Sequence, residues 1–128
     1  MRVSKDGHKA IYIDLDNKKE ILAYIKQDER HIKKFNFFVD IFLENLRNSK
    51  IYTKENISDK CQDIYAVKLF IGQENDRIYC KETNDKDGIR ITILGILHKT
   101  KKTETLSSKE ISIIEKLANY EYEFEQTN

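Results

Sequence analysis

Basic and aromatic side chains alternate in the second half of the chain, in a pattern that could bind a phosphate group. A guanidinium binds two phosphate oxygens in a fixed geometry, and an ammonium group adds a second positive charge. Tyr79 or Phe70 could stack on a nucleic-acid base beside such a site. The cations that could form it are Lys68, Arg77, Lys81 and Arg90.

A basic segment follows these residues. Residues 98–103 read HKTKKT, and His98 could act there as a general acid or base if it faces the same surface as the cations. Residues 98–109 contain four lysines and one histidine against one glutamate, whereas residues 110–128 contain five glutamates and one lysine. This segregation of charge favours a local binding surface. The lysines within the basic segment are Lys99, Lys101 and Lys102.

The same residues also fit a purely structural interpretation. An antiparallel sheet usually exposes one face to solvent, and Lys, Arg, Tyr and Thr are ordinary residues on such a face. A lysine-rich loop and a histidine at the end of a strand are also common surface features. Pattern alone therefore leaves both the anion site and the solvated surface open.

The first half of the chain is predicted to contain one strand and a helical region. Alternating apolar residues predict a strand over residues 9–15. Helical spacing then predicts either one long helix or two helices, 17–28 and 31–47, and two are favoured because residues 26–31 are polar. Residues 48–62 show no strong period and are predicted to form a loop.

The second half is predicted to form two consecutive hairpins and a helix. Strands are expected at residues 63–71, 77–83 and 89–98, with Gly, Asn and Asp in the turns between them. Ser107 or Ser108 then caps a helix that extends to about residue 122. The predicted fold is a single α+β domain of order β-α-α-β-β-β-α, with an antiparallel sheet packed on helices.

The strand registers decide which side chains share a face of this sheet. In residues 89–98 the alternation assigns Ile91 and Ile93 to the core face. Ile78 and Cys80 of the preceding strand are expected to join them there. The opposite face is then predicted to carry Lys68, Arg77, Tyr79 and Arg90.

Length and composition set further limits. The 128 residues suffice for one domain with a core, and the 23 basic residues nearly balance the 22 acidic ones, which counts against coating nucleic acid by bulk charge. The N-terminus lacks the apolar stretch of a signal peptide and no apolar run approaches about 18 residues, so a cytoplasmic protein without membrane contact is expected. Cys61 and Cys80 do not form a CxxC pair and the three histidines are far apart, so neither a disulfide nor a metal cofactor is expected.

Three short segments also carry a family likeness. They are YAVKLF, then DRIYCKE in place of the strand motif YRILY, then ILGILHKTKKT in place of LLHGFxKKTQKT, and a helix is expected after them. In their order and spacing, residues 63–122 resemble the RelE/ParE superfamily of bacterial toxins, most closely its HigB-like branch. The resemblance implies a RelE-like fold.

The resemblance also implies a function. Most members are toxins of type II toxin–antitoxin systems that act as ribosome-dependent endoribonucleases (mRNA interferases), in which a ribose 2′-hydroxyl attacks the neighbouring phosphate without a metal. Lys68 and Arg77 match basic family positions, Lys68 as a general base and Arg77 as the phosphate ligand, and Tyr79 or His98 would supply a proton to the leaving oxygen. The residues that would hold flanking phosphates are Lys81, Arg90, Lys99, Lys101 and Lys102.

The implied partners are mRNA, the ribosome and a cognate antitoxin, usually a helix-turn-helix protein. Two functions from other classes remain open. One is a ParE-like toxin that inhibits a protein target such as gyrase without nuclease chemistry. The other is a non-catalytic RNA- or protein-binding module on the same fold, since a fold does not determine a function.

Overall fold

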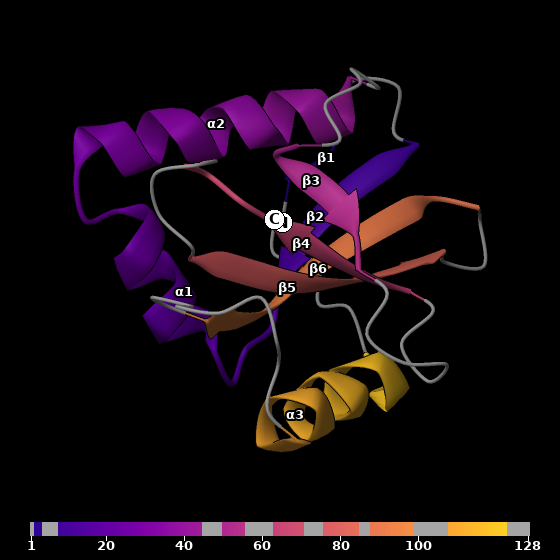
Figure 1. Ribbon diagram of the computed structural model, residues 1–128. Coiled ribbons are helices and arrows are strands. Elements are labelled where there is room, and N and C mark those ends of the chain that lie inside the picture. Colours follow the sequence, from indigo (N-terminus) through magenta and orange to yellow (C-terminus); the bar gives the residue numbers. More distant parts are fainter. Residues whose placement is uncertain are drawn as a thin grey trace.

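A six-stranded sheet forms the centre of the molecule, with two helices against one face and a third helix against the other (Figure 1). The computed structural model describes residues 2–3, 8–44, 50–55, 63–70, 76–84, 88–98 and 108–122. The helices are α1 (Lys18–Ile25), α2 (Glu29–Leu43) and α3 (Ser108–Asn119). The strands are β1 (Arg2–Val3), β2 (Lys9–Ile13), β3 (Tyr52–Lys54), β4 (Ile64–Val67), β5 (Arg77–Asn84) and β6 (Arg90–His98).

The turn after β2 is shaped by Asp14. Its carboxylate accepts hydrogen bonds from the backbone N–H groups of Asp16 at 2.8 Å and Asn17 at 3.3 Å. These bonds turn the backbone away from the extended conformation, so the strand ends at Ile13. The prediction of a strand to residue 15 is therefore too long, and Leu15 is 69% exposed in the turn.

The prediction of two separate helices is confirmed, and Asp28 marks the boundary. As the N-cap of α2, its side chain accepts a hydrogen bond from the His31 backbone N–H, and the same oxygen lies 2.8 Å from the imidazole Nδ1. These bonds, the backbone one above all, hold the pKa of Asp28 below its usual value. The helix begins at Glu29, and residues 45–47 of the predicted helix lie outside the described residues.

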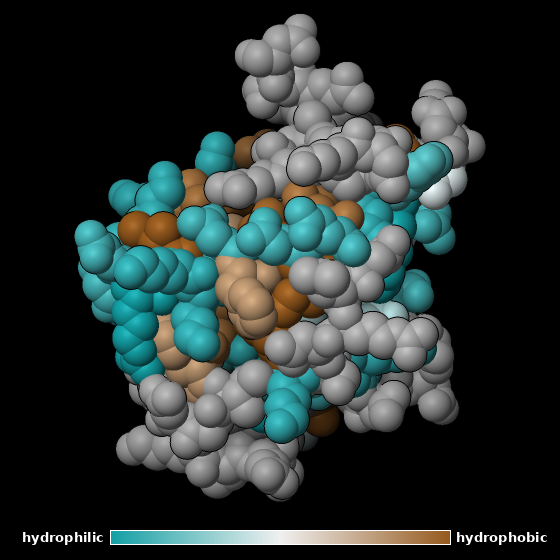
Figure 2. Space-filling model, turned by 90° about the horizontal axis from the view of Figure 1, so that it is seen from above, coloured by the Kyte–Doolittle hydropathy of each residue, from teal (hydrophilic) through white to brown (hydrophobic). Residues whose placement is uncertain are grey.

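The larger core lies between the sheet and the two N-terminal helices. Phe38 and Phe42 of α2 are almost fully buried in it, whereas Phe37 is 47% exposed. Figure 2, which views the molecule from above, shows hydrophobic side chains between hydrophilic ones on this side. The other buried residues of this core include Ile11, Ile21, Tyr24, Ile25, Val39, Ile41, Val67, Ile78, Cys80 and Leu94.

A smaller core lies on the opposite face, beneath α3. Ile114 and Leu117 of this helix pack on Ile64, Ala66 and Tyr79. Burying each large apolar side chain contributes about 1.5–3 kcal/mol, which is enough for one short helix to cover this part of the sheet. Where α3 lies, this face of the sheet is therefore not solvated, unlike the face that the purely structural interpretation describes.

The order of strands is β1-β2-β6-β5-β4-β3, and the sheet is mixed. β2 runs parallel to β6, and every other neighbouring pair is antiparallel. The prediction of an antiparallel sheet is wrong for this one pair, because α1 and α2 carry the chain across the sheet before the later strands form. The short strand β3 lies inside the predicted loop 48–62, where three residues are too few to show a period.

The pairing of β5 with β6 contains a β-bulge. Tyr79 is opposite Ile96, whereas the next residue, Cys80, is opposite Leu94, so Gly95 has no register partner on β5. One extra residue in a strand reverses the faces on which its later side chains lie. Glycine suits this position because an added Cβ would come within 2.6 Å of the Leu117 side chain of α3.

The bulge overturns the predicted assignment of faces. Ile91 and Ile93 form part of a cluster on the α3 side, whereas Ile78 and Cys80 belong to the core beneath α1 and α2. Arg90 also lies on the α1 and α2 side, with its guanidinium 5.2 Å from the centre of the Phe42 ring. The prediction that Arg77, Tyr79 and Arg90 share a face is therefore wrong for Arg90, because that prediction continued the alternation of faces through the bulge.

In the described ranges, no helix has the length and apolar character that crossing a membrane requires.

Candidate functional site

Four of the residues predicted for the site meet at one end of the sheet. Arg77, the first residue of β5, is the register partner of His98, the last residue of β6. Lys68 directly follows β4, whose last residue pairs with the neighbour of Arg77. Tyr79 lies two residues further along β5, on the same face as Arg77. Three separate segments of the chain therefore bring these side chains together.

A carboxylate that the sequence did not reveal lies between the cations. Oε1 of Glu55 is 3.5 Å from Nζ of Lys68 and 3.5 Å from Nη1 of Arg77. Glu55 follows β3, and its backbone N–H donates to the Ile64 carbonyl at 2.9 Å, which extends the β3–β4 pairing as far as this residue. No spacing in residues 48–62 indicated it, because β3 itself was not predicted.

A second carboxylate lies on His98. Oε2 of Glu110, in the first turn of α3, is 3.0 Å from the imidazole Nε2, and the two side chains are 32% and 29% exposed. The imidazole stacks on the Tyr79 ring, with 6.4 Å between ring centres and 23° between the planes. An acidic residue in the first turn is common in any helix, so no sequence pattern connects Glu110 with this site. The name "Arg77 cluster" denotes Glu55, Lys68, Arg77, Tyr79, His98 and Glu110.

The Arg77 cluster is incompletely satisfied. In the part of the chain that the structure describes, three buried side-chain polar atoms form no hydrogen bond, and all three belong to this cluster. They are Oε1 of Glu55, the hydroxyl of Tyr79 and Nδ1 of His98. Buried polar atoms nearly always form hydrogen bonds in folded proteins, whereas Glu55 Oε1 has only its long ion pairs and the other two atoms lack even these, so this cluster is the candidate functional site.

Tyr79 cannot play either of the parts predicted for it without rearrangement. Its side chain is only 2% exposed, so its ring cannot stack on a base. Burial raises the pKa of its hydroxyl, and the nearby Arg77 guanidinium opposes that shift only in part, which makes Tyr79 a poor proton donor. Phe70, the other predicted stacking residue, is buried on the α1 and α2 side, where Arg30 lies 3.7 Å from its ring centre.

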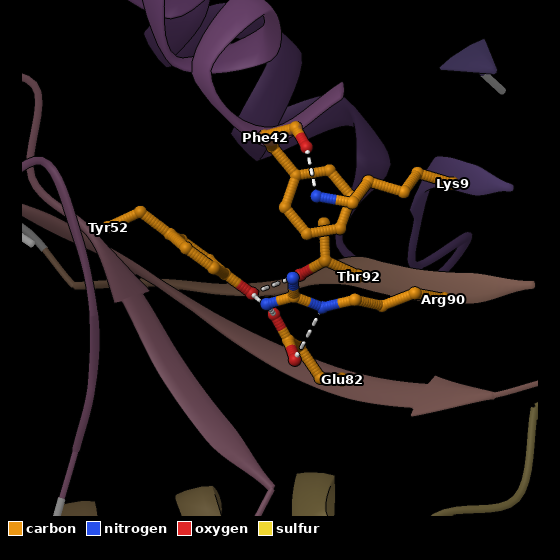
Figure 3. A network of polar contacts seen from close by, with 6 residues as sticks. All are labelled: Lys9, Phe42, Tyr52, Glu82, Arg90 and Thr92. Atoms are coloured by element: carbon orange, nitrogen blue, oxygen red, sulfur yellow. Dashed lines mark hydrogen bonds and ion pairs between the residues drawn. The ribbon is translucent and has the colours of Figure 1, made fainter. Parts of the chain in front are cut away.

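Arg90 belongs to a different set of contacts, on the opposite face (Figure 3). Its Nη2 donates to Glu82 Oε1 at 2.7 Å and its Nε to Oε2 at 3.2 Å. The hydroxyl of Tyr52 donates to the same carboxylate at 2.6 Å and lies 3.0 Å from the Thr92 hydroxyl. The name "Glu82 network" denotes Lys9, Phe42, Tyr52, Glu82, Arg90 and Thr92.

The Glu82 network stabilises the fold. Nζ of Lys9, a buried residue, donates to the Phe42 carbonyl at 2.8 Å, where the C-terminal turn of α2 leaves carbonyls without helical partners. Hydrogen bonds to Glu82 raise the pKa of Arg90, and burial raises the pKa of Tyr52. Arg90 and Tyr52 therefore both stay protonated, and both donate hydrogen bonds to the Glu82 carboxylate. Arg90 therefore has a structural contact, with which the predicted RNA contact would have to compete; the RNA contact itself stays a prediction.

Lys81 also has a partner within the protein. Its Nζ donates to the backbone carbonyl of Tyr120, just beyond α3. The Tyr122 hydroxyl donates to Asp14, and the rings of Tyr120 and Tyr122 lie 4.6 Å apart. These contacts fasten the chain after α3 to the sheet, so the predicted RNA contact of Lys81 would compete with a structural bond.

The last predicted residues to consider are the lysines of the basic segment and the two cysteines. Lys99, Lys101 and Lys102 lie outside the described residues, as does Cys61. Cys80 is a free buried thiol whose pKa is raised by burial. Among the described side chains, no three of His, Cys, Asp or Glu are grouped as metal ligands.

Comparisons of the chain with protein-family models, with curated proteins and with solved structures found no match. The function must therefore be inferred from the chemistry of the Arg77 cluster and from the motifs of the sequence.

Proposed function

We propose that this protein is the toxin of a bacterial type II toxin–antitoxin system and that it cleaves mRNA on the ribosome. The observation that carries the proposal is the meeting of Lys68, Arg77 and His98, from three segments, at one end of the sheet. The likeness of residues 63–122 to the motifs of the RelE/ParE superfamily assigns RNA cleavage to the same side chains. The order of two strands, two helices, four further strands and a last helix, in which β2, α1, α2, β4, β5, β6 and α3 follow the expected order, supports a RelE-like fold.

In this proposal Arg77 and Lys68 bind the phosphate at the cleaved bond. A guanidinium has five N–H donors and an ammonium group has three, so each can contact Glu55 and a phosphate oxygen together. The two cations would then stabilise the negative charge that grows on the phosphate as the 2′-oxygen attacks. The geometry supports Lys68 as a phosphate ligand better than as a general base, because a carboxylate as well as a cation lies beside it.

His98 is the best candidate for proton transfer. The His98 and Glu110 side chains are both partly exposed, so a ribose hydroxyl or a leaving oxygen could take the place of Glu110 on Nε2. Tyr79 would hold the imidazole of His98 in place by stacking on its ring, without touching RNA. The partners in the proposal are mRNA, the ribosome and a helix-turn-helix antitoxin in the cytoplasm, with Lys99, Lys101 and Lys102 on flanking phosphates.

One observation favours a second candidate, a non-catalytic RNA-binding module. The Tyr79 hydroxyl and Nδ1 of His98 are enclosed, and Nε2 of His98 is already held by Glu110. A cluster of this kind could bind a phosphodiester through Lys68 and Arg77 without moving a proton. The two candidates differ in whether the RNA chain is cut.

Primer extension on an mRNA in a cell-free translation reaction tests the proposal. The purified protein is compared with Arg77→Ala, with ribosomes present or omitted. Arg30→Ala is the matched control, because Arg30 is an exposed arginine over Phe70 on the other face of the sheet. We expect cuts that require ribosomes, that are lost in Arg77→Ala and that persist in Arg30→Ala.

Other results would lead to the alternatives. Cuts that persist in Arg77→Ala would remove Arg77 from the mechanism. Intact mRNA with unaffected translation would contradict the nuclease proposal and favour a ParE-like inhibitor or a binding module. Intact mRNA together with RNA binding that depends on Arg77 would favour the binding module alone.

A further inference from the structure

We propose that Glu55 determines which kind of phosphate the Arg77 cluster accepts. The cluster would bind an internal phosphodiester, which has one negative charge, in preference to a terminal phosphate, which has nearly two at neutral pH. This inference rests on one part of the proposed function, the assignment of Lys68 and Arg77 as phosphate ligands. It does not require that the bound RNA is cleaved.

The position of Glu55 is the first argument. A single oxygen, Oε1, lies 3.5 Å from the cationic nitrogens of both Lys68 and Arg77. A direct charge-assisted hydrogen bond would be about 2.7–2.9 Å long, so neither cation is fully engaged by the carboxylate. Both therefore keep donors for an incoming anion, which must bind beside Glu55.

The backbone holds this carboxylate in place. The Glu55 N–H donates to the Ile64 carbonyl at 2.9 Å, and the Lys68 N–H donates to the Ile51 carbonyl at 2.8 Å. These bonds flank the short ladder of β3 and β4, so Glu55 and Lys68 are fixed to the same two strands. The Glu55 side chain is only 19% exposed, which limits its escape into solvent when an anion arrives.

The charge balance is the second argument. Lys68 and Arg77 supply two positive charges, and Glu55 cancels one of them. The positive charge that remains equals the negative charge of one phosphodiester. A terminal phosphate would place its second charge close to Glu55, and Glu110 on His98 adds a further carboxylate to the same cluster. Like charges at such short range in a partly buried site disfavour binding.

The unsatisfied atoms are the third argument. The Tyr79 hydroxyl is more than nine-tenths buried, lies beside the Arg77 guanidinium, and forms no hydrogen bond of ordinary length and angle within the described residues. This hydroxyl is enclosed and carries no charge, so it neither attracts nor repels the second negative charge of a terminal phosphate. Selection by charge is thus left to Glu55.

Binding of two small ligands that cannot be cleaved tests the inference. One is a thymidine dinucleotide with one internal phosphodiester and no terminal phosphate, and the other is thymidine 3′-monophosphate. Both lack a 2′-hydroxyl, so only binding is measured. Affinities are obtained by titration followed by NMR, at a pH above the second pKa of phosphate, about 6.

The variants are Glu55→Gln, which removes the charge at nearly constant shape, and Glu55→Asp, which keeps it. Glu44→Gln is the matched control, because Glu44 is an exposed carboxylate directly after α2, on the other face of the sheet. We expect Glu55→Gln to bind the monophosphate roughly tenfold more tightly and the dinucleotide only about threefold more tightly. Glu55→Asp and Glu44→Gln should keep the preference of the unmodified protein.

Three results would overturn the inference. They are an equal gain for both ligands in Glu55→Gln, no gain for either, and a preference of the unmodified protein for the monophosphate. Circular dichroism of each variant checks that it is folded. Because neither ligand can be cleaved, selectivity can be confirmed even if the primer-extension experiment finds no nuclease, and a nuclease can be found even if Glu55 has no effect here.

Discussion

The Arg77 cluster and the Glu82 network lie on opposite faces of one sheet and are built from similar residues, but their polar atoms are satisfied to different extents. Each places an arginine on a glutamate with a tyrosine nearby. In the Glu82 network the contacts of Arg90, Tyr52 and Glu82 are 2.6–3.2 Å long. In the Arg77 cluster the contacts to Glu55 are 3.5 Å long, and the tyrosine hydroxyl is unpaired.

The difference indicates which of the two clusters is available for binding. A fully paired network gains little from a ligand, because binding would break bonds that already exist. A cluster with enclosed, unpaired atoms already carries a free-energy cost, and a ligand or a rearrangement that pairs those atoms recovers it. We therefore interpret the Glu82 network as structural and the Arg77 cluster as functional.

Arg77→Ala is expected to have the largest effect, and the effect should be on activity. Loss of one group that stabilises the charge of the transition state lowers the cleavage rate by about 100- to 1,000-fold. The free energy of unfolding should change by about 1 kcal/mol or less, since the contact is 3.5 Å long and Lys68 stays beside Glu55 when Arg77 is removed. Cleavage rates and urea unfolding measure the two quantities. Unchanged cleavage with a large loss of stability would mean that the Arg77 cluster is structural and not functional.

Glu82→Ala is expected to affect stability in place of activity. The change leaves Tyr52 and Arg90 without their shared acceptor, which should lower the free energy of unfolding by about 2–3 kcal/mol. The exposed residue Glu121 provides a control, and Glu121→Ala should stay within about 0.5 kcal/mol. A folded, fully stable Glu82→Ala protein with lost activity would mean that the two clusters have been assigned the wrong way round.

Gly95→Ala tests the bulge that separates the two clusters. The new Cβ would meet the Leu117 side chain at 2.6 Å, so α3 or the bulge must shift, at an expected cost of about 1–3 kcal/mol. A shift of α3 should also move Glu110 away from His98 and lower activity. The change in the free energy of unfolding is measured with urea, and unaltered stability would show that Leu117 moves aside freely.

Two tyrosines give the smallest but most direct comparison. Tyr52→Phe removes a hydroxyl that contacts both Glu82 and Thr92, and should cost about 1–2 kcal/mol. Tyr79→Phe removes a hydroxyl that forms no hydrogen bond, so stability should change by less than about 0.5 kcal/mol or increase. Thermal or urea unfolding of both variants measures the contrast, and equal losses would contradict the distinction between the clusters.

Much of the fold could be predicted because its elements have clear periods. The alternation in residues 77–83 and 89–98 gave β5 and β6, and polar residues near Asp28 separated α1 from α2. Turn residues marked the hairpins. These signals are local, so they predict single helices and strands without knowledge of how the elements pack on one another.

The parts that could not be predicted depend on long-range contacts. The bulge at Gly95 reversed the alternation, so Arg90 was assigned to the wrong face. The packing of α3 over the sheet, which buries Tyr79, is not visible in a strand pattern. Glu55 and Glu110 reach the site only through β3 and α3, and no local spacing connects either residue with Arg77 or His98.

The parallel pairing of β2 with β6 has a consequence for when the chain can fold during its synthesis. Lys9 is the register partner of Arg90, so the apolar faces of β2, α1 and α2 are made long before the strand on which β2 docks. Contacts between such distant segments form late and slow the folding of a domain. Nascent chains that stop before β6 should therefore stay unfolded and sensitive to protease. If the protein is the proposed toxin, its active structure would form only after residue 98 has left the ribosome, so a nascent chain would be inactive until its synthesis is almost complete.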